Sequence, residues 1–188
     1  MSEYLLSTSG LTKQFGHHKA VNNVDLHVKK GAIYGFIGRN GAGKTTFLKM
    51  ISGLSKPTDG EIQMFGYRNE ELKNVRSRIS CLIEAPGIYG NMSAYHNLAI
   101  KCRLFGINDS KYIENILKIV GLSEVGKKKT KHFSLGMKQR LGIGLALVGE
   151  PDLLVLDEPI NGLDPQGIAE IRDMLLRLKE EQNMTIII

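Results

Sequence analysis

The segment Gly38–Thr46, which reads GRNGAGKTT, constrains the fold of this chain more than any other stretch. It matches the phosphate-binding pattern G-x-x-x-x-G-K-[ST] through Gly38, Gly43, Lys44 and Thr45. Glycines allow a tight backbone turn whose N–H groups point at an anion, and a following helix N-terminus adds partial positive charge there. The pattern therefore predicts a phosphate-binding loop rather than a glycine-rich turn without a ligand.

The flanks of this loop have the character that the motif requires. Ala32–Ile37 is an apolar run of strand length, and Thr45–Ile51 is typical of a helix that ends near Gly53. In this setting we expect Lys44 to reach the β- and γ-phosphates of a nucleotide, and the Thr45 hydroxyl to ligate Mg²⁺. The residues of the loop expected to contact the nucleotide are Gly38, Arg39, Asn40, Gly41, Ala42, Gly43, Lys44, Thr45 and Thr46.

Composition narrows the class of protein. The 188 residues suit one domain, and 42% hydrophobic with 23% charged residues is ordinary for a soluble globular protein. No apolar run approaches the roughly 18 residues of a membrane span. The N-terminus lacks the basic region of a signal peptide. Cys81 and Cys102 have no metal-ligand spacing, which favours reduced thiols in the cytosol. The net charge of +6 is densest at Lys127–Lys131, where we expect a solvated loop.

The first part of the chain is typical of short strands separated by turns. Strands are expected at Tyr4–Thr8, Asp25–Val28 and Glu61–Phe65, with a turn at Pro57–Gly60. A further strand is expected at Ile79–Ile83, followed by an irregular stretch over 84–92.

A helical insertion then interrupts this pattern. Ser93 is a candidate N-cap for a helix that ends before Gly106, and a second helix is expected over Ser110–Val120, with Gly121 as its stop. The second helix carries one apolar stripe at helical spacing, namely Ile113, Ile116, Leu117 and Val120. We therefore expect a small helical subdomain over residues 93–132.

The α/β pattern returns after the insertion. An apolar helix is expected over Phe133–Gly149, a buried strand over Asp152–Leu156, and a last strand over Thr185–Ile188. Between these strands, Asp164 and a proline at the first helical position predict another helix start. Its apolar face is expected to comprise Ile168, Ile171, Leu175 and Leu178. A buried parallel strand is an unusual native terminus, so we expect the protein to continue beyond Ile188.

Two acidic residues, Asp157 and Glu158, directly follow the expected strand Asp152–Leu156. In open parallel sheets, ligands bind at the carboxyl ends of the strands. An apolar strand that ends in acid, in a chain with a phosphate-binding loop, is typical of a Walker B motif. We expect Asp157 to hold Mg²⁺, directly or through water. We expect Glu158 to polarise the water that attacks the γ-phosphate, with Lys44 as the other catalytic residue.

At two segments the chain resembles the ATP-binding subunits of ABC transporters. Phe133–Arg140 (FSLGMKQR) aligns with the family signature L-S-G-G-Q-x-Q-R, and Asp157–Pro165 (DEPINGLDP) contains the family's D-loop. The resemblance assigns further nucleotide contacts to Phe15 (adenine stacking), Glu84 (Q-loop position), Ser134, Gly136 and Asp164. Ser134 and Gly136 also precede an expected helix N-terminus, which suits a γ-phosphate and favours this role of Ser134 over the alternative of a plain helix cap.

The resemblance covers essentially the whole chain and implies a fold and an assembly. The implied fold is α/β: a P-loop NTPase core with a mainly parallel sheet, an N-terminal antiparallel β subdomain and the helical insertion, all within one ABC domain over 1–188. The implied cofactors are ATP and Mg²⁺. The implied partners are a second ATP-binding subunit in a head-to-tail dimer and transmembrane permease subunits contacted around Gly87–Asn97. This places the protein at the cytoplasmic face of the cell membrane, and no nucleic-acid partner is expected.

The chain departs from the family pattern at four points. Leu135 replaces the first glycine of the signature, Met137 replaces its glutamine, and Glu84 stands where glutamine is usual. The family's switch histidine lies beyond the strand that begins at Thr185, and none of the five histidines here takes that position. The combination of SLGMKQR with a glutamate Q-loop resembles the subgroup that exports bacitracin-type and lantibiotic peptides, often for immunity or resistance.

Two other classes of function remain open on the sequence alone. One is a soluble ABC ATPase that acts on ribosomes or DNA, which the basic charge favours, although neither a tandem second domain nor a long coiled coil is present in these 188 residues. The other is a non-hydrolysing, ATP-gated interaction module, which the substitutions at Leu135, Met137 and Glu84 favour. A small-molecule kinase or a GTPase leaves the signature unexplained.

Overall fold

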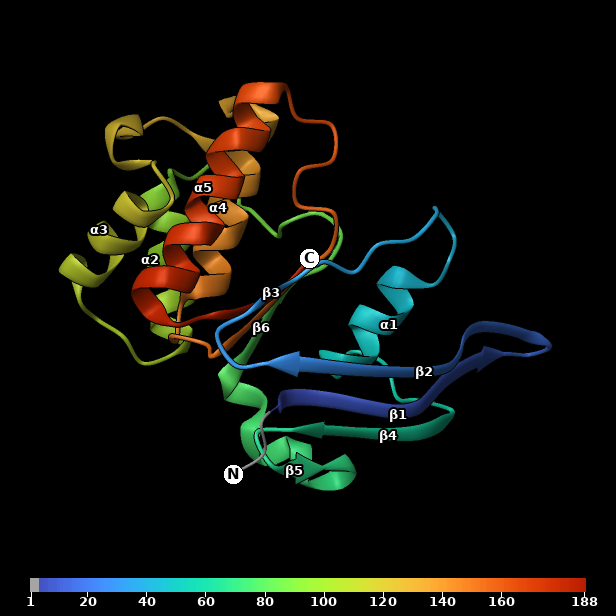
Figure 1. Cartoon of the computed structure of the whole chain (residues 1–188). Helices are drawn as coiled ribbons and strands as arrows, with labels where there is room; N and C mark the ends of the chain where they lie inside the picture. Colours follow the sequence, from blue (N-terminus) through green and yellow to red (C-terminus); the bar gives the residue numbers. More distant parts are fainter. Residues whose placement is uncertain (1–3) are drawn as a thin grey trace.

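The computed structural model describes residues 4–188, which form two four-stranded sheets and five α-helices (Figure 1). The antiparallel sheet has the strand order β2-β1-β4-β5, with β1 (Tyr4–Phe15), β2 (His18–Lys29), β4 (Asp59–Met64) and β5 (Tyr67–Arg68). The parallel sheet has the order β3-β8-β7-β6, with β3 (Ile33–Tyr34), β8 (Thr185–Ile187), β7 (Leu153–Leu156) and β6 (Ile79–Leu82). This arrangement confirms the predicted fold class.

The helices and their caps follow the sequence signals. The α-helices are α1 (Lys44–Ile51), α2 (Ala94–Leu104), α3 (Ser110–Ile119), α4 (Leu135–Leu147) and α5 (Pro165–Gln182), and the 3₁₀ helices are η1 (Asn69–Arg78), η2 (Ser123–Val125) and η3 (Thr130–His132). The caps predicted at Ser93 and Asp164 are confirmed, because each accepts a backbone N–H of its own helix through a side-chain oxygen. Ser134, for which a cap was the alternative interpretation, does the same at the start of α4. Along the described residues 4–188, no helix combines the length and apolar character needed to cross a bilayer.

Local prediction was less accurate for the lengths of strands. β1 and β2 are 12 residues each and pair along their length with several register shifts, so they extend well past the predicted Tyr4–Thr8 and Asp25–Val28. Backbone pairing in the hairpin maintains these strands through polar stretches that carry no alternating pattern. Conversely, β3 is only two residues long, because the chain leaves the sheet towards the phosphate-binding loop soon after pairing with β8.

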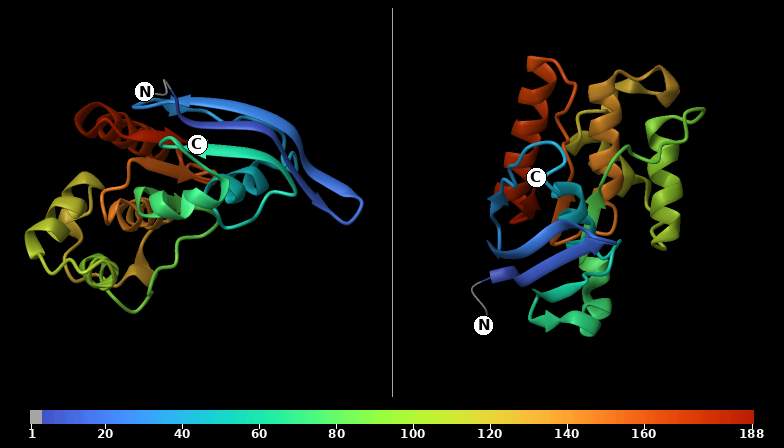
Figure 2. Two further views of the ribbon diagram at one scale, coloured as in Figure 1. Left: turned by 90° about the horizontal axis from the view of Figure 1, so that it is seen from below. Right: turned by 90° about the vertical axis from the view of Figure 1, so that its right-hand side faces the viewer.

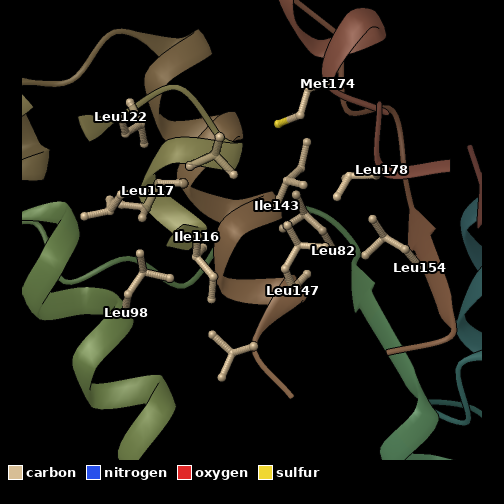
Figure 3. Packing of buried hydrophobic residues seen from close by; sticks show 14 of the residues in the cluster. Leu82, Leu98, Ile116, Leu117, Leu122, Ile143, Leu147, Leu154, Met174 and Leu178 are labelled. Atoms are coloured by element: carbon tan, nitrogen blue, oxygen red, sulfur yellow. The ribbon is translucent and has the colours of Figure 1, made fainter. Parts of the chain in front are cut away.

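The parallel sheet separates two hydrophobic clusters, and β7 contributes to both. Leu154 and Leu156 point into a cluster shared with α2, α3, α4 and α5, while Leu153 and Val155 point into a cluster shared with α1 and the antiparallel sheet. Figure 3 shows the first cluster, in which Leu82 lies beside Ile143 and Leu147 of α4 and Leu154 lies near Leu178 of α5. Burial on both faces explains why the strand is apolar at every position.

The helices of the region 93–132 lie on one side of the molecule. Figure 2 shows α2 and α3 and the antiparallel sheet on opposite sides of the parallel sheet. The predicted stripe on α3 is buried: Ile113, Ile116, Leu117 and Val120 all belong to the cluster that also contains residues of α4 and α5. The insertion therefore shares its core with the rest of the domain, and its treatment as a separate subdomain stays a prediction.

The predicted apolar face of α5 needs one correction. Ile171, Leu175 and Leu178 are buried, together with Met174, but the side chain of Ile168 is 37% exposed. Ile168 lies in the first turn of α5 and borders an open apolar cavity instead of the core. The helical period identified the side of α5 that faces the core, but this side becomes buried only from the second turn of the helix onward.

Candidate functional site

The loop Gly38–Thr46 connects β3 to α1, and its residues 39–42 are exposed. Gly41 and Gly43 have φ angles of 79° and 88°, a left-handed conformation that glycine adopts without steric cost. A Cβ atom at Gly43 would also collide with the carbonyl oxygen of Ala20 in β2. The glycine at this position is therefore required both by backbone conformation and by the close approach of the antiparallel sheet.

Lys44 is folded back into the loop. Its Nζ donates hydrogen bonds to the carbonyl oxygens of Gly38, at 2.8 Å, and Arg39, at 3.3 Å. The same ammonium lies 3.5 Å from Oε1 of Glu158, and the Lys44 side chain is 16% exposed. The two residues predicted to be catalytic thus lie together, although they are far apart in the sequence.

Thr45 and Asp157 also meet, as the prediction of a shared Mg²⁺ site requires. The Thr45 hydroxyl donates a 2.6 Å hydrogen bond to Oδ2 of Asp157 across 112 residues of sequence. Asp157 is held at the end of β7, where its backbone N–H donates to the carbonyl of Leu82 at the end of β6. The sheet therefore places the carboxylate of Asp157 beside the N-terminal turn of α1. Thr46, in the same turn, is half-buried.

Glu158 has a left-handed backbone, with φ of 49°, and its side chain is 45% exposed. Asn161 Nδ2 donates to its Oε2 at 3.1 Å, so the carboxylate is held from two sides, by Lys44 and by Asn161. Sequence reasoning assigned no role to Asn161. The signal was present, because Asn161 belongs to the D-loop motif, but only Asp164 was selected from that motif.

Glu84 follows β6 and carries a second interaction that the sequence did not reveal. Its Oε1 lies 2.6 Å from Nζ of Lys49 in the last turn of α1. This hydrogen bond and ion pair lower the pKa of Glu84 below its ordinary value. No local signal identifies the pair, because the two residues are 35 positions apart and Lys49 stands outside every motif.

Phe15 lies at the end of β1, opposite His18 of β2, on the hairpin that also approaches the loop through Ala20. Its side chain is 55% exposed, and the ammonium of Lys13 lies 5.2 Å from the ring centroid. An exposed aromatic ring on this hairpin is available to stack on a planar ligand.

The signature residues contact the D-loop rather than the phosphate-binding loop. Ser134 Oγ accepts the Met137 N–H at 3.2 Å, so it serves as a helix cap. A Cβ atom at Gly136 would lie 3.7 Å from Leu163, and one at Gly162 would lie 3.2 Å from Leu135. Asp164 in turn caps α5 by accepting the Gly167 N–H. Within residues 4–188, no hydrogen bond joins Ser134 or Gly136 to the phosphate-binding loop.

A cavity of about 530 Å³ adjoins Lys44, Asp157 and Glu158. Its remaining walls are almost entirely apolar and come from β3, α1, α5 and the end of β8. The polar site therefore occupies the carboxyl edge of the parallel sheet, as the topology predicts, with apolar surface next to it.

Comparison with known proteins gives a consistent result. The sequence pattern of the family described as "ABC transporter" matches residues 21–161. The bacitracin transport ATP-binding protein BcrA of Enterococcus faecalis is 49% identical over 99% of this chain and 61% of its own length. The lantibiotic transport ATP-binding protein SrtF of Streptococcus pyogenes is 43% identical over 98% of this chain and 79% of its own. The chain thus spans about three fifths of the length of the BcrA protein.

Solved structures of similar shape belong to the same family. The chain cbiO1 of the ABC transporter complex cbiONQ from Clostridium perfringens has a TM-score of 0.87 and 28% identity, covering 99% of this chain and 78% of that one. The ATP-binding cassette MJ0796, solved as a dimer in a post-hydrolysis state with ADP and Pi, has a TM-score of 0.82 and 26% identity, with 97% and 86% covered.

Proposed function

This chain belongs to the ABC transporter family, and we propose that it binds ATP with Mg²⁺ and hydrolyses the ATP to energise transport. The observation that carries the proposal is the 2.6 Å contact between Thr45 and Asp157. It joins the hydroxyl of the phosphate-binding loop to the carboxylate that follows the Walker B strand, and these two motifs lie far apart in the sequence. A glycine-rich turn without a ligand would have no need of a carboxylate at this position.

The donor set fits a magnesium nucleotide. Thr45 and Asp157 supply hard oxygen ligands, and Mg²⁺ in nucleotide enzymes is held by few protein oxygens together with phosphates. Among the residues that the structure describes, no group of three or more His, Cys, Asp or Glu residues could hold a metal ion. Mg²⁺, when bound, offsets part of the negative charge that develops on the phosphates.

The side chains of the site have separate roles in the proposed reaction. Lys44 exchanges its contacts with loop carbonyls for phosphate oxygens, and the N–H groups of residues 39–43 bind the same phosphates. Glu158, held by Asn161, orients the attacking water and accepts its proton. Phe15 stacks on the adenine, which contributes about 1 kcal/mol. Positioning and electrostatics therefore provide most of the catalysis.

The hydrolytic role is tested by Glu158→Gln, which preserves the size of the side chain and removes its basicity. Steady-state turnover is expected to fall by about 10²–10⁴ while ATP binding is retained. Lys44→Ala is expected to weaken nucleotide binding itself. Wild-type turnover in Glu158→Gln would exclude Glu158 as the base, and absence of phosphate release from the wild-type protein with its membrane partner would favour the non-hydrolysing alternative.

The proposed active assembly is a head-to-tail dimer. Ser134 and Gly136 stand at the N-terminus of α4, whose partial positive charge suits a phosphate. Since their contacts within this chain are with α4 and the D-loop, the second subunit is the source of the nucleotide that they contact. The dimeric state of the similar protein MJ0796 supports this arrangement.

The proposed membrane partner is a permease subunit that docks around Gly87–Asn97, which places the protein at the cytoplasmic face of the membrane. A cavity of about 320 Å³ lies at this surface, between the loop that contains Pro86 and Tyr89 and the helices α2 and α4. The loop that lines this cavity follows Glu84 directly in the sequence, so the docked subunit would contact a segment next to the nucleotide site. The names of the relatives BcrA and SrtF support a peptide antibiotic of the bacitracin or lantibiotic type as the transported compound.

The transported compound is tested by growth inhibition with bacitracin and several lantibiotics. Cells carry the intact transporter genes, or the same genes with Lys44→Ala. Sensitivity to one compound in the mutant alone supports export of, or immunity to, that peptide. If the wild-type protein hydrolyses ATP but the mutant cells show unchanged sensitivity to every compound, the peptide-antibiotic assignment is refuted. The proposal that the protein is an ATPase is then unaffected.

A further inference from the structure

Two neighbouring strands end in the same arrangement, and the proposed function uses only one of them. β6 and β7 pair in parallel, and each is followed by a glutamate with a left-handed backbone: Glu84 with φ of 66° and Glu158 with φ of 49°. Each glutamate meets a lysine of the same helix α1. Lys44 lies 3.5 Å from Glu158, and Lys49 lies 2.6 Å from Glu84. The pair Lys49–Glu84 has no role in the mechanism above.

Stability of the fold does not explain this pair. Left-handed backbone at a residue other than glycine costs free energy and is concentrated at functional sites. The side chains of Lys49 and Glu84 are 36% and 67% exposed, and exposed ion pairs add little to stability. The same arrangement, a left-handed glutamate paired with a lysine of α1, occurs at the ends of both strands, and this repetition indicates a role in the function of the site.

The location of Glu84 suggests which role. Glu84 stands two residues after Leu82, whose carbonyl accepts the N–H of Asp157, the carboxylate bonded to Thr45. An unpaired carboxylate here would add negative charge to an edge of the sheet that already carries Asp157 and Glu158. Binding of a negatively charged nucleotide would then be opposed by three carboxylates instead of two.

We propose that Lys49 is a positioning residue that acts through Glu84: it holds the carboxylate against α1 and neutralises it, so that this subunit binds MgATP with a glutamate where the family usually has glutamine. The inference rests on the proposed nucleotide site. The lowered pKa of Glu84 agrees with the pairing, because the hydrogen bond and the positive charge of Lys49 stabilise the ionised carboxylate. Lys49 thus compensates for the charge that the glutamate introduces.

The test is a double-mutant cycle on binding of the magnesium complex of the non-hydrolysable analogue AMP-PNP to the full-length protein. Lys49→Met is expected to raise the Kd roughly five- to tenfold, as loss of one nearby countercharge predicts. In the Glu84→Gln background the same change is expected to alter the Kd by less than about twofold. Lys49→Arg retains the charge and the wild-type Kd. Raising the KCl concentration reduces the effect of Lys49→Met, since salt screens it.

The matched control is Lys118→Met. Lys118 is the basic residue in the last turn of α3, as Lys49 is in α1, so both substitutions remove the same favourable interaction with a helix end. Lys118→Met is expected to leave the Kd unchanged. An equal loss of affinity from Lys49→Met in the wild-type and Glu84→Gln backgrounds would overturn the inference, because Lys49 would then act without Glu84. Failure of the wild-type protein to bind the analogue would instead refute the proposed function.

Discussion

Asn97 is expected to fix the loop that we propose as the permease contact, and its replacement by alanine tests this. The side chain is 3% exposed and makes three hydrogen bonds. Oδ1 accepts the N–H of Tyr89 at 2.8 Å, and Nδ2 donates to the carbonyl oxygens of Tyr89, at 3.2 Å, and Ser93, at 2.9 Å. The side-chain amide of Asn97 thus holds the loop against the first turn of α2 by hydrogen bonds.

The hydrogen bonds around Asn97 determine how much stability its replacement by alanine removes. In Asn97→Ala the Tyr89 carbonyl still accepts the Thr130 hydroxyl at 2.9 Å, and the Ser93 carbonyl still accepts a helical N–H. Only the N–H of Tyr89 loses its sole partner. Two lost hydrogen bonds at about 1 kcal/mol each, with an orphaned donor at about 1–3 kcal/mol, predict a loss of roughly 3–5 kcal/mol in the free energy of unfolding. For a chain of this length the Tm falls by roughly 6–20 °C.

The assay is equilibrium unfolding in urea, with Asn115→Ala as the matched control. Asn115 is exposed on α3, so its replacement by alanine changes helix propensity in the same way without removing the hydrogen bonds that hold the loop. Asn97→Asp is expected to be destabilising as well, because it retains the acceptor for the Tyr89 N–H but turns the donor into a second acceptor facing two carbonyls. Stability of Asn97→Ala within about 0.5 kcal/mol of the control would refute the reasoning.

Three further predictions follow from local geometry. Gly60 and Gly66 have φ of 87° and 86°, but a Cβ atom at Gly60 would lie 2.5 Å from a backbone oxygen of β1 while the space at Gly66 is open. Urea unfolding should therefore show a loss of about 1–2 kcal/mol for Gly66→Ala and at least about 1 kcal/mol more for Gly60→Ala; equal losses would contradict the clash. Carboxyl NMR titration should show that the pKa of Glu84 lies below its ordinary value, and that Lys49→Met raises this pKa back to the ordinary value. The ion pair of Glu84 with Lys49 therefore persists at neutral pH and is lost as the pH falls through the lowered pKa of Glu84. Cys102, which is 0% exposed and whose pKa is raised by burial, should react with thiol reagents only after unfolding; rapid labelling of the native protein would contradict its burial.

Much of the site was predictable because its signals are local. The phosphate-binding loop, the acid after β7 and the caps at Ser93, Ser134 and Asp164 each depend on residues within a few positions of one another. The prediction that Thr45 and Asp157 share one site required one further rule, that ligands bind at the carboxyl edge of a parallel sheet.

Features that depend on distant pairing were missed or misjudged. The lengths of β1 and β2 follow from the hairpin register, and the exposure of Ile168 follows from where the packed layers begin. The contact of Lys49 with Glu84 requires α1 and the end of β6 to be placed side by side. No spacing in the sequence encodes that distance.

The sequence by itself determined which chemical groups this protein has at its phosphate-binding loop and strand ends, because backbone conformation and helix capping are decided by neighbouring residues. Tertiary structure decided which of those groups face one another. The order β3-β8-β7-β6 sets Glu84 beside the strand that holds Asp157 and Glu158, and packing of α1 on this sheet supplies a lysine to each glutamate. Charges act through space over a few ångströms, so their pairing is fixed only when the fold brings distant segments together.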